Sequence, residues 1–255
     1  MELQGKTALI TGGNSGIGLA TARLMIARGA RVAITGRDRT KLDEAATELG
    51  TGVLVLQADL TDPKALAGVT QAVGDAFGHL DILFANAGIS GSSPLGTTTL
   101  EAFESVLRTN LTAVFFTVQS LLPLMGDGGA IVLNSSVMRE MGAPGSAAYA
   151  ASKGGVTSMA KVFAAELATR GIRVNTVVPG GTRTPIWTRG ARAGATIDGT
   201  EKAFAPRIAL GRFAEADEVA RAVAFLAATP GITGAEVVVD GGLTGAPWGA
   251  PVFRA

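Results

Sequence analysis

The sequence of 255 residues predicts an α/β fold in which a doubly wound, seven-stranded parallel sheet forms a single domain. Three observations indicate this class. Short runs rich in Val, Ile and Leu alternate with longer amphipathic stretches along the chain. The short runs are almost continuously apolar, as expected for parallel strands that helices cover on both faces. No linker, repeat or low-complexity segment divides the chain, so we expect one domain over residues 1–255.

The individual elements follow from this alternation. Strands are expected at Thr7–Thr11, Arg31–Thr35, Val53–Gln57, Ile82–Ala85, Ala130–Asn134, Arg173–Val177 and Glu236–Val239. Helices are expected at Gly16–Arg28, Thr40–Leu49, Pro63–Phe77, Leu100–Leu124, Ala147–Thr169 and Ala216–Ala227. Because crossovers between parallel strands are right-handed, this order predicts helices on both sides of one sheet.

One long segment, residues 182–210, has no clear period and is expected to be irregular. Its helix-breaking and bulky residues are Pro185, Trp187, Gly190, Gly194, Gly199 and Pro206. Structureless segments of this length inside compact domains are usually functional or disordered. We interpret the segment as a lid over the active site.

Composition excludes several classes of function. The formal net charge of +1, with both signs mixed along the chain, argues against a nucleic-acid partner or an acidic membrane surface. The chain has no cysteine, which excludes disulfides and fits a cytoplasmic location. The first residues do not resemble a signal peptide, and the most apolar stretch, Leu111–Met125, is too short for a membrane span. No His, Asp and Glu cluster indicates a metal.

A tyrosine-based proton donor is the chemistry that the composition leaves. Tyr149 and Lys153 are four residues apart on a predicted helix, so the phenol and the ammonium can share one face. Ser136 follows the predicted strand that ends at Asn134. Lowering a tyrosine pKa from about 10 to about 7 takes roughly 4 kcal/mol. A cation at about 4 Å, with an effective dielectric constant of about 20, contributes that much.

The turn between the first strand and the first helix is rich in glycine. Glycine at such a turn lets the backbone approach a pyrophosphate, and the helix N-terminus offers N–H donors and a favourable dipole. Its spacing, Gly-x-x-x-Gly-x-Gly, differs from the plain dinucleotide fingerprint, and a turn without a ligand is the alternative. The residues expected to bind the cofactor here are Gly12, Asn14, Ser15, Gly16, Ile17 and Gly18.

The end of the second strand bears on the choice between NADP and NAD. Asp38 lies about 20 residues beyond Gly18, where a carboxylate can bind the ribose 2′-hydroxyl of NAD. Asp38 also precedes a helix, where capping is the ordinary role of Asp. Arg37 suits a 2′-phosphate because guanidinium forms charge-assisted hydrogen bonds, and Gly36 places no carboxylate nearby. We therefore favour NADP(H) over NAD(H).

Two further strand ends carry candidate cofactor contacts. Asp59 and Leu60 follow the third strand, where the Asp59 carboxylate can accept a hydrogen bond from an adenine amino group or simply form the turn. Asn86, Ala87 and Gly88 follow the fourth strand, and their small size permits close approach to a cofactor or forms a tight turn.

These motifs together resemble the short-chain dehydrogenase/reductase family in its single-domain form. Within that family they are most similar to 3-oxoacyl-carrier-protein reductases and carbonyl reductases. The likeness covers nearly the whole chain and includes the late Val239-Asp240-Gly241-Gly242. It implies a catalytic tetrad of Asn110, Ser136, Tyr149 and Lys153.

The resemblance also assigns roles within this tetrad and around it. Lys153 would also bind the nicotinamide ribose, together with Tyr149 at the same end of the cofactor. Asn110 would interrupt its helix and hold a water that relays protons to Lys153. Further cofactor contacts are implied at Pro179, Gly180, Thr182 and Thr184. Thr182 replaces the branched aliphatic residue more common in relatives, and the tail 243–255 is longer than in many. A homotetramer is the implied assembly.

A ligand on an open parallel sheet binds at the carboxyl ends of the strands. The substrate pocket is therefore expected to be lined by Ser90, Met138, Met141, Pro144, Ile186 and Trp187. This mostly apolar set favours a hydrophobic ketone or aldehyde as the small-molecule substrate. The lid also carries five basic residues, which meet either an acidic carrier, a phosphate on the substrate, or solvent: Arg183, Arg189, Arg192, Lys202 and Arg207.

The sequence leaves three functional hypotheses. The first is an NADPH-dependent reductase that converts a ketone or aldehyde to an alcohol reversibly. The second is a 3-oxoacyl-carrier-protein reductase. The third, from another class, is a sensor or scaffold protein that binds NADP without turnover.

Overall fold

The computed structural model describes residues 3–188 and 194–246 of the chain. Its centre is a seven-stranded sheet in the order β3-β2-β1-β4-β5-β6-β9, and every pairing in it is parallel. Its strands are β1 (Thr7–Thr11), β2 (Arg31–Gly36), β3 (Leu54–Gln57), β4 (Leu80–Ala85), β5 (Met125–Asn134), β6 (Arg173–Pro179) and β9 (Glu236–Val239). The predicted fold class is confirmed.

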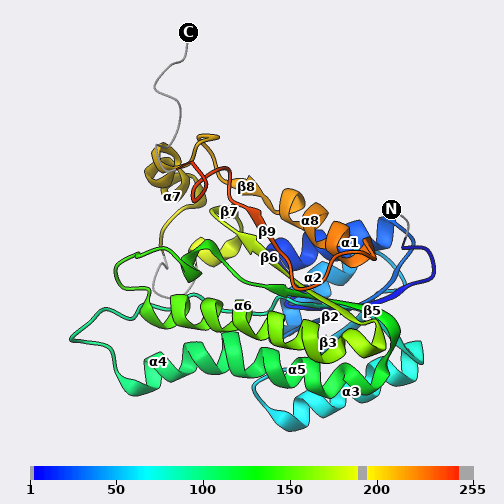
Figure 1. The fold of residues 1–255 in the computed structure, drawn as a ribbon. Helices are drawn as coiled ribbons and strands as arrows, with labels where there is room; N and C mark the ends of the chain where they lie inside the picture. Colours follow the sequence, from blue (N-terminus) through cyan, green and yellow to red (C-terminus); the bar gives the residue numbers. More distant parts are fainter. Residues whose placement is uncertain (1–2, 189–193, 247–255) are drawn as a thin grey trace.

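Helices cover both faces of this sheet (Figure 1). One face carries α1 (Gly16–Ala27), α2 (Arg39–Leu49) and α8 (Ala216–Ala228). The other carries α3 (Pro63–Phe77), α4 (Leu100–Leu107), α5 (Ala113–Leu121) and α6 (Ala147–Leu167). The strand order reverses direction at β1 and β4, which is the position where open α/β sheets bind ligands.

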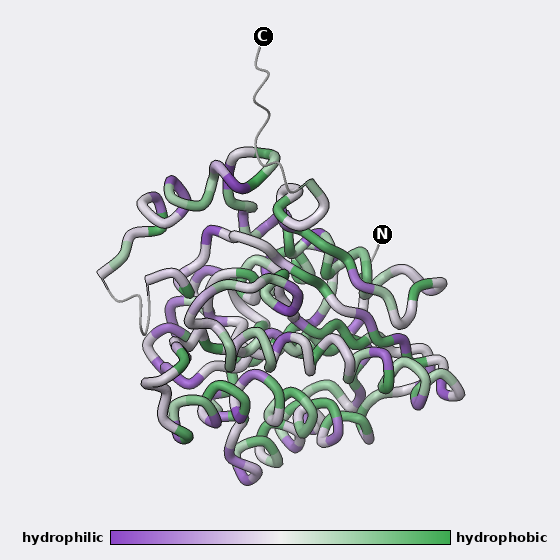
Figure 2. The backbone as a smooth tube through the Cα atoms, turned by 60° about the vertical axis from the view of Figure 1, so that its left-hand side comes forward, coloured by the Kyte–Doolittle hydropathy of each residue, from purple (hydrophilic) through white to green (hydrophobic). Residues whose placement is uncertain are grey.

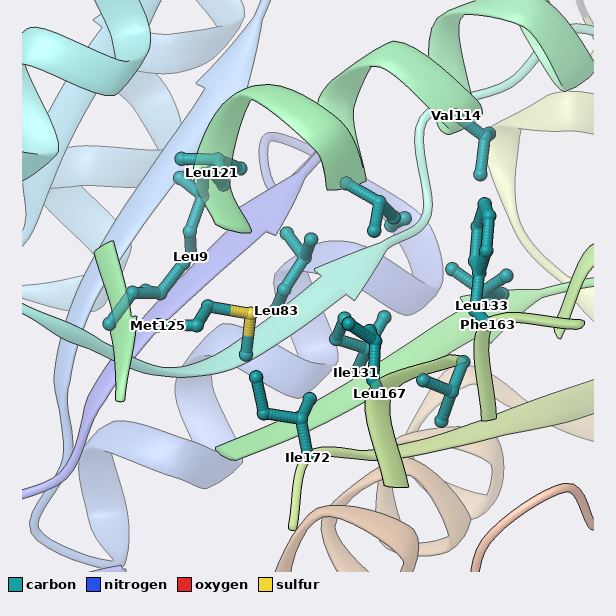
Figure 3. Close-up of a cluster of buried hydrophobic side chains, with 14 of the residues drawn as sticks. Leu9, Leu83, Val114, Leu121, Met125, Ile131, Leu133, Phe163, Leu167 and Ile172 are labelled. Carbon is teal, nitrogen blue, oxygen red and sulfur yellow. The ribbon is translucent and has the colours of Figure 1, made fainter. Parts of the chain in front are cut away.

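Alternate residues of each strand enter two separate cores because successive side chains point to opposite faces. Leu9, Leu83 and Ile131 pack with α3, α5 and α6, and Figure 3 shows these side chains together with Phe163. Their neighbours in sequence, among them Ile10, pack with α1, α2 and α8. This double coverage is the reason that the strands read as continuous apolar runs.

Helices such as α3 and α8 have one apolar side and one polar side, and Figure 2 shows apolar and polar residues mixed along the helical segments. Two helices begin with a capping aspartate: Asp38 accepts from the Lys41 N–H, and Asp62 accepts from the Lys64 N–H. Such caps satisfy backbone donors that the first turn leaves unpaired. Within the described ranges, no helix is long and apolar enough to cross a membrane.

Two predicted boundaries were wrong in an informative way. The stretch expected to be one helix over Leu100–Leu124 is divided by a π-helical turn at Arg108–Thr112 and ends in a 3₁₀ turn, Leu122–Leu124. Strand β5 begins at Met125, five residues before the expected start, and a register shift separates its first pairing, with Leu80, from the rest. The three glycines among the first five residues of β5 interrupt the apolar pattern from which the strand was predicted.

The segment 182–210 is more ordered than predicted. It contains the short strand β7 (Thr182–Arg183), a 3₁₀ turn at Pro185–Thr188, helix α7 (Ile197–Phe204) and a 3₁₀ turn at Ala205–Arg207. Strand β7 pairs in parallel with β8 (Ala214–Glu215) to form a second, two-stranded sheet. Helix α7 begins at Thr196, whose hydroxyl accepts from the Gly199 N–H, so this glycine lies in a first turn and not in a loop.

Several residues singled out in the sequence lie outside the described ranges. They are Gly190, Arg189 and Arg192 of the lid and, beyond residue 246, most of the C-terminal tail.

Candidate active site

A cleft of about 1240 Å³ lies at the carboxyl ends of the strands. It runs from the residues that follow β2 and β3, across the first turn after β1, to the segment that contains β7 and α7. All the predicted site residues line it except Gly18 and Asn110. The six residues expected to line a substrate pocket all line this cleft: Ser90, Met138, Met141, Pro144, Ile186 and Trp187.

The turn after β1 is shaped by glycine. Gly12 and Gly16 have φ angles of +64° and +54°, which side chains with a Cβ rarely adopt. A Cβ on Gly18 would lie 2.3 Å from the Gly12 carbonyl oxygen, so Gly18 allows α1 to pack against this turn and does not itself face the cleft. Helix α1 starts at Ser15, with no side-chain cap and no acidic residue in its first turn. This arrangement suits a phosphate group.

The residues after β2 set the charge at one end of the cleft. Arg37 is exposed and lines the cleft. Asp38 also lines it, but its carboxylate caps α2 by accepting from the Lys41 N–H at 3.2 Å and lies 3.7 Å from the Lys41 ammonium. The Asn14 side chain occupies the space beside Gly36, because a Cβ there would lie 2.8 Å from Asn14 Cγ. A side chain at position 36 therefore has no room.

Asp59 lies across from Arg37 at this end of the cleft. Its carboxylate accepts from the Thr61 N–H at 3.0 Å and from the Thr61 hydroxyl at 2.8 Å. Partial burial raises the pKa of Asp59, but these hydrogen bonds and the charge of Arg37 together hold that pKa below its usual value. The carboxylate is therefore ionised near neutral pH.

The turn Asn86-Ala87-Gly88 is tied to the end of β1. The Thr11 hydroxyl accepts from the N–H groups of Asn86 and Ala87, each at 2.9 Å. The Asn86 amide donates to the Thr11 carbonyl at 2.9 Å and accepts from Asn134 at 2.8 Å. These hydrogen bonds fix the turn after β4 to the carboxyl ends of β1 and β5.

Lys153 is the buried cation of the site. Its ammonium donates to the Asn134 carbonyl at 2.7 Å and lies 5.7 Å from the centre of the Tyr149 ring. Burial lowers the pKa of Lys153 to about 8, so the side chain is still mostly protonated at pH 7. The ammonium charge therefore lies close to the Tyr149 ring.

Gly88 lies against Asn110 and Lys153. A Cβ at Gly88 would approach Asn110 Oδ1 to 3.2 Å and Lys153 Nζ to 3.7 Å. Three separate elements thus converge here: the turn after β4, the π-helical turn and α6.

Asn110 is fully buried behind the cleft, in the π-helical turn. Its side-chain oxygen accepts from the Ile89 N–H at 2.8 Å, and its amide donates to the Ile89 carbonyl at 2.9 Å and to the Ser152 hydroxyl at 3.3 Å. Both polar groups of the side chain are thus engaged by protein. The Asn110 side chain therefore connects the segment that follows β4, through Ile89, with helix α6, through Ser152.

Ser136 faces the cleft from the end of β5. Its hydroxyl accepts from the Met138 N–H at 3.2 Å and starts a short 3₁₀ turn. The preceding Ser135, which the sequence reading did not single out, donates to the Lys153 carbonyl at 2.9 Å and contacts the Thr157 hydroxyl at 2.8 Å. Ser135 therefore fixes α6 against β5, a role that no local sequence pattern indicates.

Where the cleft meets the segment that contains β7 and α7, which we call the lid end, its wall is an aromatic cluster that consists of Trp187, Phe204 and Phe213. The Trp187 ring stacks on Phe213 with centroids 5.1 Å apart and lies 5.7 Å from Phe204. The indole N–H donates to the Thr182 carbonyl at 2.8 Å. The sequence analysis did not identify Phe213, whose ring leaves no room for a side chain at Gly181, since a Cβ there would lie 2.3 Å from that ring.

An ion-pair network fastens the same segment. The guanidinium of Arg183, on β7, binds Asp198 and Glu201 of α7 and lies 3.7 Å from Glu215 of β8. Glu201 also accepts from the Phe213 N–H at 3.2 Å. Arg183 is thus neutralised by protein carboxylates and is directed away from a role as a free cation of the lid.

The residues present fit a bound dinucleotide. The glycine turn and an uncapped helix start line the cleft and suit phosphates, and Tyr149 and Lys153 line the same cleft. The volume of about 1240 Å³ leaves room for a substrate beside it. Among the described residues, no group of three or more His, Asp or Glu side chains is placed to hold a metal ion.

Burial of Lys153 predicts a pH-dependent stability. An unfolded lysine titrates near about 10.4, and the folded one near about 8, so the unfolded state binds more protons between these values. The free energy of unfolding should therefore rise with pH in this window, and the cost of burying the charge applies in full below it. The difference corresponds to about 3 kcal/mol.

Urea unfolding at pH 7.5, 9 and about 10, at one protein concentration, measures this effect. Wild type should gain stability relative to Lys153→Met as the pH rises. Lys64→Met, which removes an exposed lysine at the start of α3, serves as the matched control and should keep the wild-type slope. Identical slopes in wild type and Lys153→Met would contradict the burial of a charged lysine.

Comparison with known proteins extends over nearly the whole chain. Residues 12–244 match the protein-family model described as enoyl-(acyl carrier protein) reductase. The oxidoreductase asL5 of Sarocladium schorii is 40% identical over 246 residues, which cover 95% of this chain and 97% of the relative. The 3-oxoacyl-(acyl-carrier-protein) reductase FabG of Thermotoga maritima is 38% identical over 250 residues, covering 95% and 99%.

A third relative and two solved structures extend the comparison. Cis-4-hydroxycyclohexanecarboxylate dehydrogenase of Sinomonas cyclohexanicum is 37% identical over 246 residues, covering 94% of this chain and 96% of the relative. A short-chain dehydrogenase from Burkholderia cenocepacia in complex with NADP superposes with a TM-score of 0.86 at 36% identity, covering 95% and 99%. A 3-ketoacyl-(acyl-carrier-protein) reductase from Brucella melitensis complexed with NADH gives 0.87 at 31% identity, covering 95% and 100%.

Proposed function

We propose that this chain, which belongs to the short-chain dehydrogenase/reductase family, catalyses the reversible NADPH-dependent reduction of a ketone or aldehyde to an alcohol. It is an NAD(P)-dependent oxidoreductase that acts on CH–OH groups. The observation that supports the finer proposal is that Ser136, Tyr149 and Lys153 line the same cleft as the glycine turn.

In the proposed reaction, the bound nicotinamide supplies the hydride to the carbonyl carbon. The Ser136 hydroxyl donates a hydrogen bond to the carbonyl oxygen and orients it. The Tyr149 phenol donates its proton to that oxygen as negative charge develops there, and in the reverse direction it accepts the proton as phenolate. Positioning and proton transfer are thus supplied by residues from the end of β5 and from α6.

Lys153 keeps the phenol acidic. Its ammonium is held by the Asn134 carbonyl, 2.7 Å away, and this bond prevents it from reaching into solvent. The tie from Ser135 to the main chain of Lys153 fixes the first half of α6 against the sheet. A positive charge held in a buried place favours the ionised form of a neighbouring phenol.

The preference for NADP is supported by the residues after β2. Arg37 is exposed at the cleft, whereas the carboxylate of Asp38 is occupied in capping α2. Asn14 fills the space beside Gly36, so no acidic group can stand there to repel a 2′-phosphate. Of the two solved neighbours, one binds NADP and the other NADH, so the choice rests on Arg37 in this chain.

An alternative is the reduction of 3-oxoacyl groups on a carrier protein, and the likeness to the Thermotoga maritima reductase favours it. The hypothesis from the sequence was that lid arginines bind the acidic carrier. The ion pairs of Arg183 disfavour such a role for this residue, because three carboxylates of the chain itself already surround its guanidinium.

The test is a panel of carbonyl substrates assayed by NADPH absorbance. It includes cyclohexanone, 4-oxocyclohexanecarboxylate, its methyl ester, and 3-oxobutanoyl thioesters of N-acetylcysteamine and of a phosphopantetheine carrier. Turnover of free ketones supports the proposal, and strong preference for the carrier thioester favours the alternative. Tight NADPH binding without turnover of any member would instead indicate a sensor.

We also propose that the protein assembles as a homotetramer. Exposed apolar side chains gather on two adjoining helices: Phe115 and Phe116 on α5, and Val162 on α6. The Phe115 ring lies 5.7 Å from that of Phe163, so the two helices form one continuous surface. Apolar patches of this kind are typical of subunit interfaces. Light scattering should give a molar mass four times the 25.7 kDa of one chain.

A further inference from the structure

The charges around the cleft are distributed unevenly. Within the described residues, six charged side chains line it. Four follow β2 and β3 at the nucleotide end: Arg37, Asp38, Lys41 and Asp59. Lys153 lies with the catalytic group. Arg207 alone lies at the lid end, where the other lining side chains are mostly apolar.

Arg207 differs from the other arginines of its region in its partners. Arg183 is bound by carboxylates of α7 and β8, and Arg212 donates to both oxygens of Glu218 at 2.7 and 2.9 Å. In the described part of the chain, no carboxylate lies within ion-pair distance of Arg207. Its charge is therefore available to a ligand.

The position of Arg207 is held by its neighbours. It ends the 3₁₀ turn Ala205–Arg207, and the next residue, Ile208, is buried. Its guanidinium carbon lies 6.0 Å from the centre of the Phe204 ring, which in turn packs against Trp187. The aromatic cluster therefore places a cation at the edge of an apolar pocket.

This combination has a definite chemical meaning. Apolar walls bury a hydrocarbon portion of a ligand, and a planar guanidinium binds an oxyanion through two parallel hydrogen bonds. We propose that Arg207 binds an anionic group of the substrate, and that the preferred substrates are apolar carbonyl compounds that carry a negative charge. The inference rests on the proposed reductase function and names the substrate class of that site.

The anion has two possible sources with the same chemistry. One is the carboxylate of a free oxo acid, and the other is the phosphate of a phosphopantetheine thioester. Each source is compared with a neutral compound from the panel. The carboxylate of 4-oxocyclohexanecarboxylate is compared with its methyl ester, and the 3-oxobutanoyl thioester of the phosphopantetheine carrier is compared with that of N-acetylcysteamine. The quantity measured is the ratio of kcat/KM for the anionic compound to that for the neutral one.

Substitution of Arg207 should lower this ratio for one of the two pairs. Arg207→Gln should reduce it about three- to tenfold, since an ion pair at a partly exposed site is modest in strength. Arg207→Glu should reduce it further through repulsion, and Arg207→Lys should restore part of it. In wild type, the ratio should also fall with added NaCl, because salt screens exposed charges.

Lys202→Gln is the matched control, because Lys202 is an exposed cation of α7 that does not line the cleft. It should leave the ratio at the wild-type value. Unchanged ratios for both pairs in Arg207→Gln and Arg207→Glu would overturn the inference, as would a change confined to the KM for NADPH. Those results are distinct from failure of the proposed function, which would appear as no turnover of any substrate by wild type.

Discussion

Replacing Tyr149 by phenylalanine should lower kcat for ketone reduction by about 10²- to 10⁴-fold, the usual contribution of a positioned general acid. Tyr149→Phe removes one oxygen atom and keeps the ring beside Lys153, so the packing of α6 is retained. The Kd for NADPH, measured by fluorescence titration, should change little. Steady-state rates with cyclohexanone give the comparison, and unimpaired turnover in Tyr149→Phe would remove the proposed mechanism.

The chain contains a single tyrosine, which makes a second measurement possible. Phenolate absorbance in a pH titration reports Tyr149 alone. The pH at which the phenolate appears should match the pH at which the rate of alcohol oxidation rises. Both should move upward together in Lys153→Met, because the stabilising charge is lost. If the midpoint of the pH–rate profile shifts in Lys153→Met while the midpoint of the phenolate absorbance does not, the acid is a group other than Tyr149.

Replacing Arg37 by aspartate should shift cofactor preference towards NADH. Two charge-assisted hydrogen bonds to a 2′-phosphate contribute about 3 kcal/mol at an exposed site, which corresponds to roughly 100-fold in kcat/KM. The new carboxylate should also repel the phosphate. The ratio of kcat/KM for NADPH to that for NADH should therefore fall by at least about 100-fold in Arg37→Asp.

Arg39→Asp provides the control for this experiment. Arg39 is exposed at the start of α2 and pairs with Asp43, but it does not line the cleft. The same change of charge at this position should alter the cofactor ratio by no more than about threefold, because salt screens a charge that is not in contact. Equal changes of the cofactor ratio in the two variants would indicate that the electrostatic potential of the surface sets the preference, and not a direct contact between Arg37 and the 2′-phosphate.

Much of the fold is readable from local patterns. The apolar runs and the turns between them predict all seven strands of the main sheet, because helices on both faces make each strand apolar along its whole length. Local reading fails where the chain contains many glycines. The start of β5 was missed for this reason, and helix α7 was missed because it lies in a segment interrupted by proline and glycine. Each is stabilised by a partner distant in sequence: Leu80 for the strand and Arg183 for the helix.

The candidate site shows the same division. The spacing of Tyr149 and Lys153 places both on one helix face, but only their combination with the glycine turn and the family resemblance marks them as a candidate pair. Ser135 and Phe213 carry no such local mark. Their roles come from a bond to α6 and from stacking on Trp187, which exist only after distant segments have packed together.

The sequence by itself predicted the fold class correctly, and it indicated a glycine-rich cofactor turn and a Tyr149–Lys153 pair, since each of these patterns depends on neighbours within a few residues. Tertiary structure alone decided which charges remain available. It paired Arg183 with three carboxylates, engaged Asp38 in a helix cap and left Arg37 and Arg207 facing the cleft. The physical reason is that a charge interacts with whatever the fold brings within a few ångströms, and sequence distance does not report that separation.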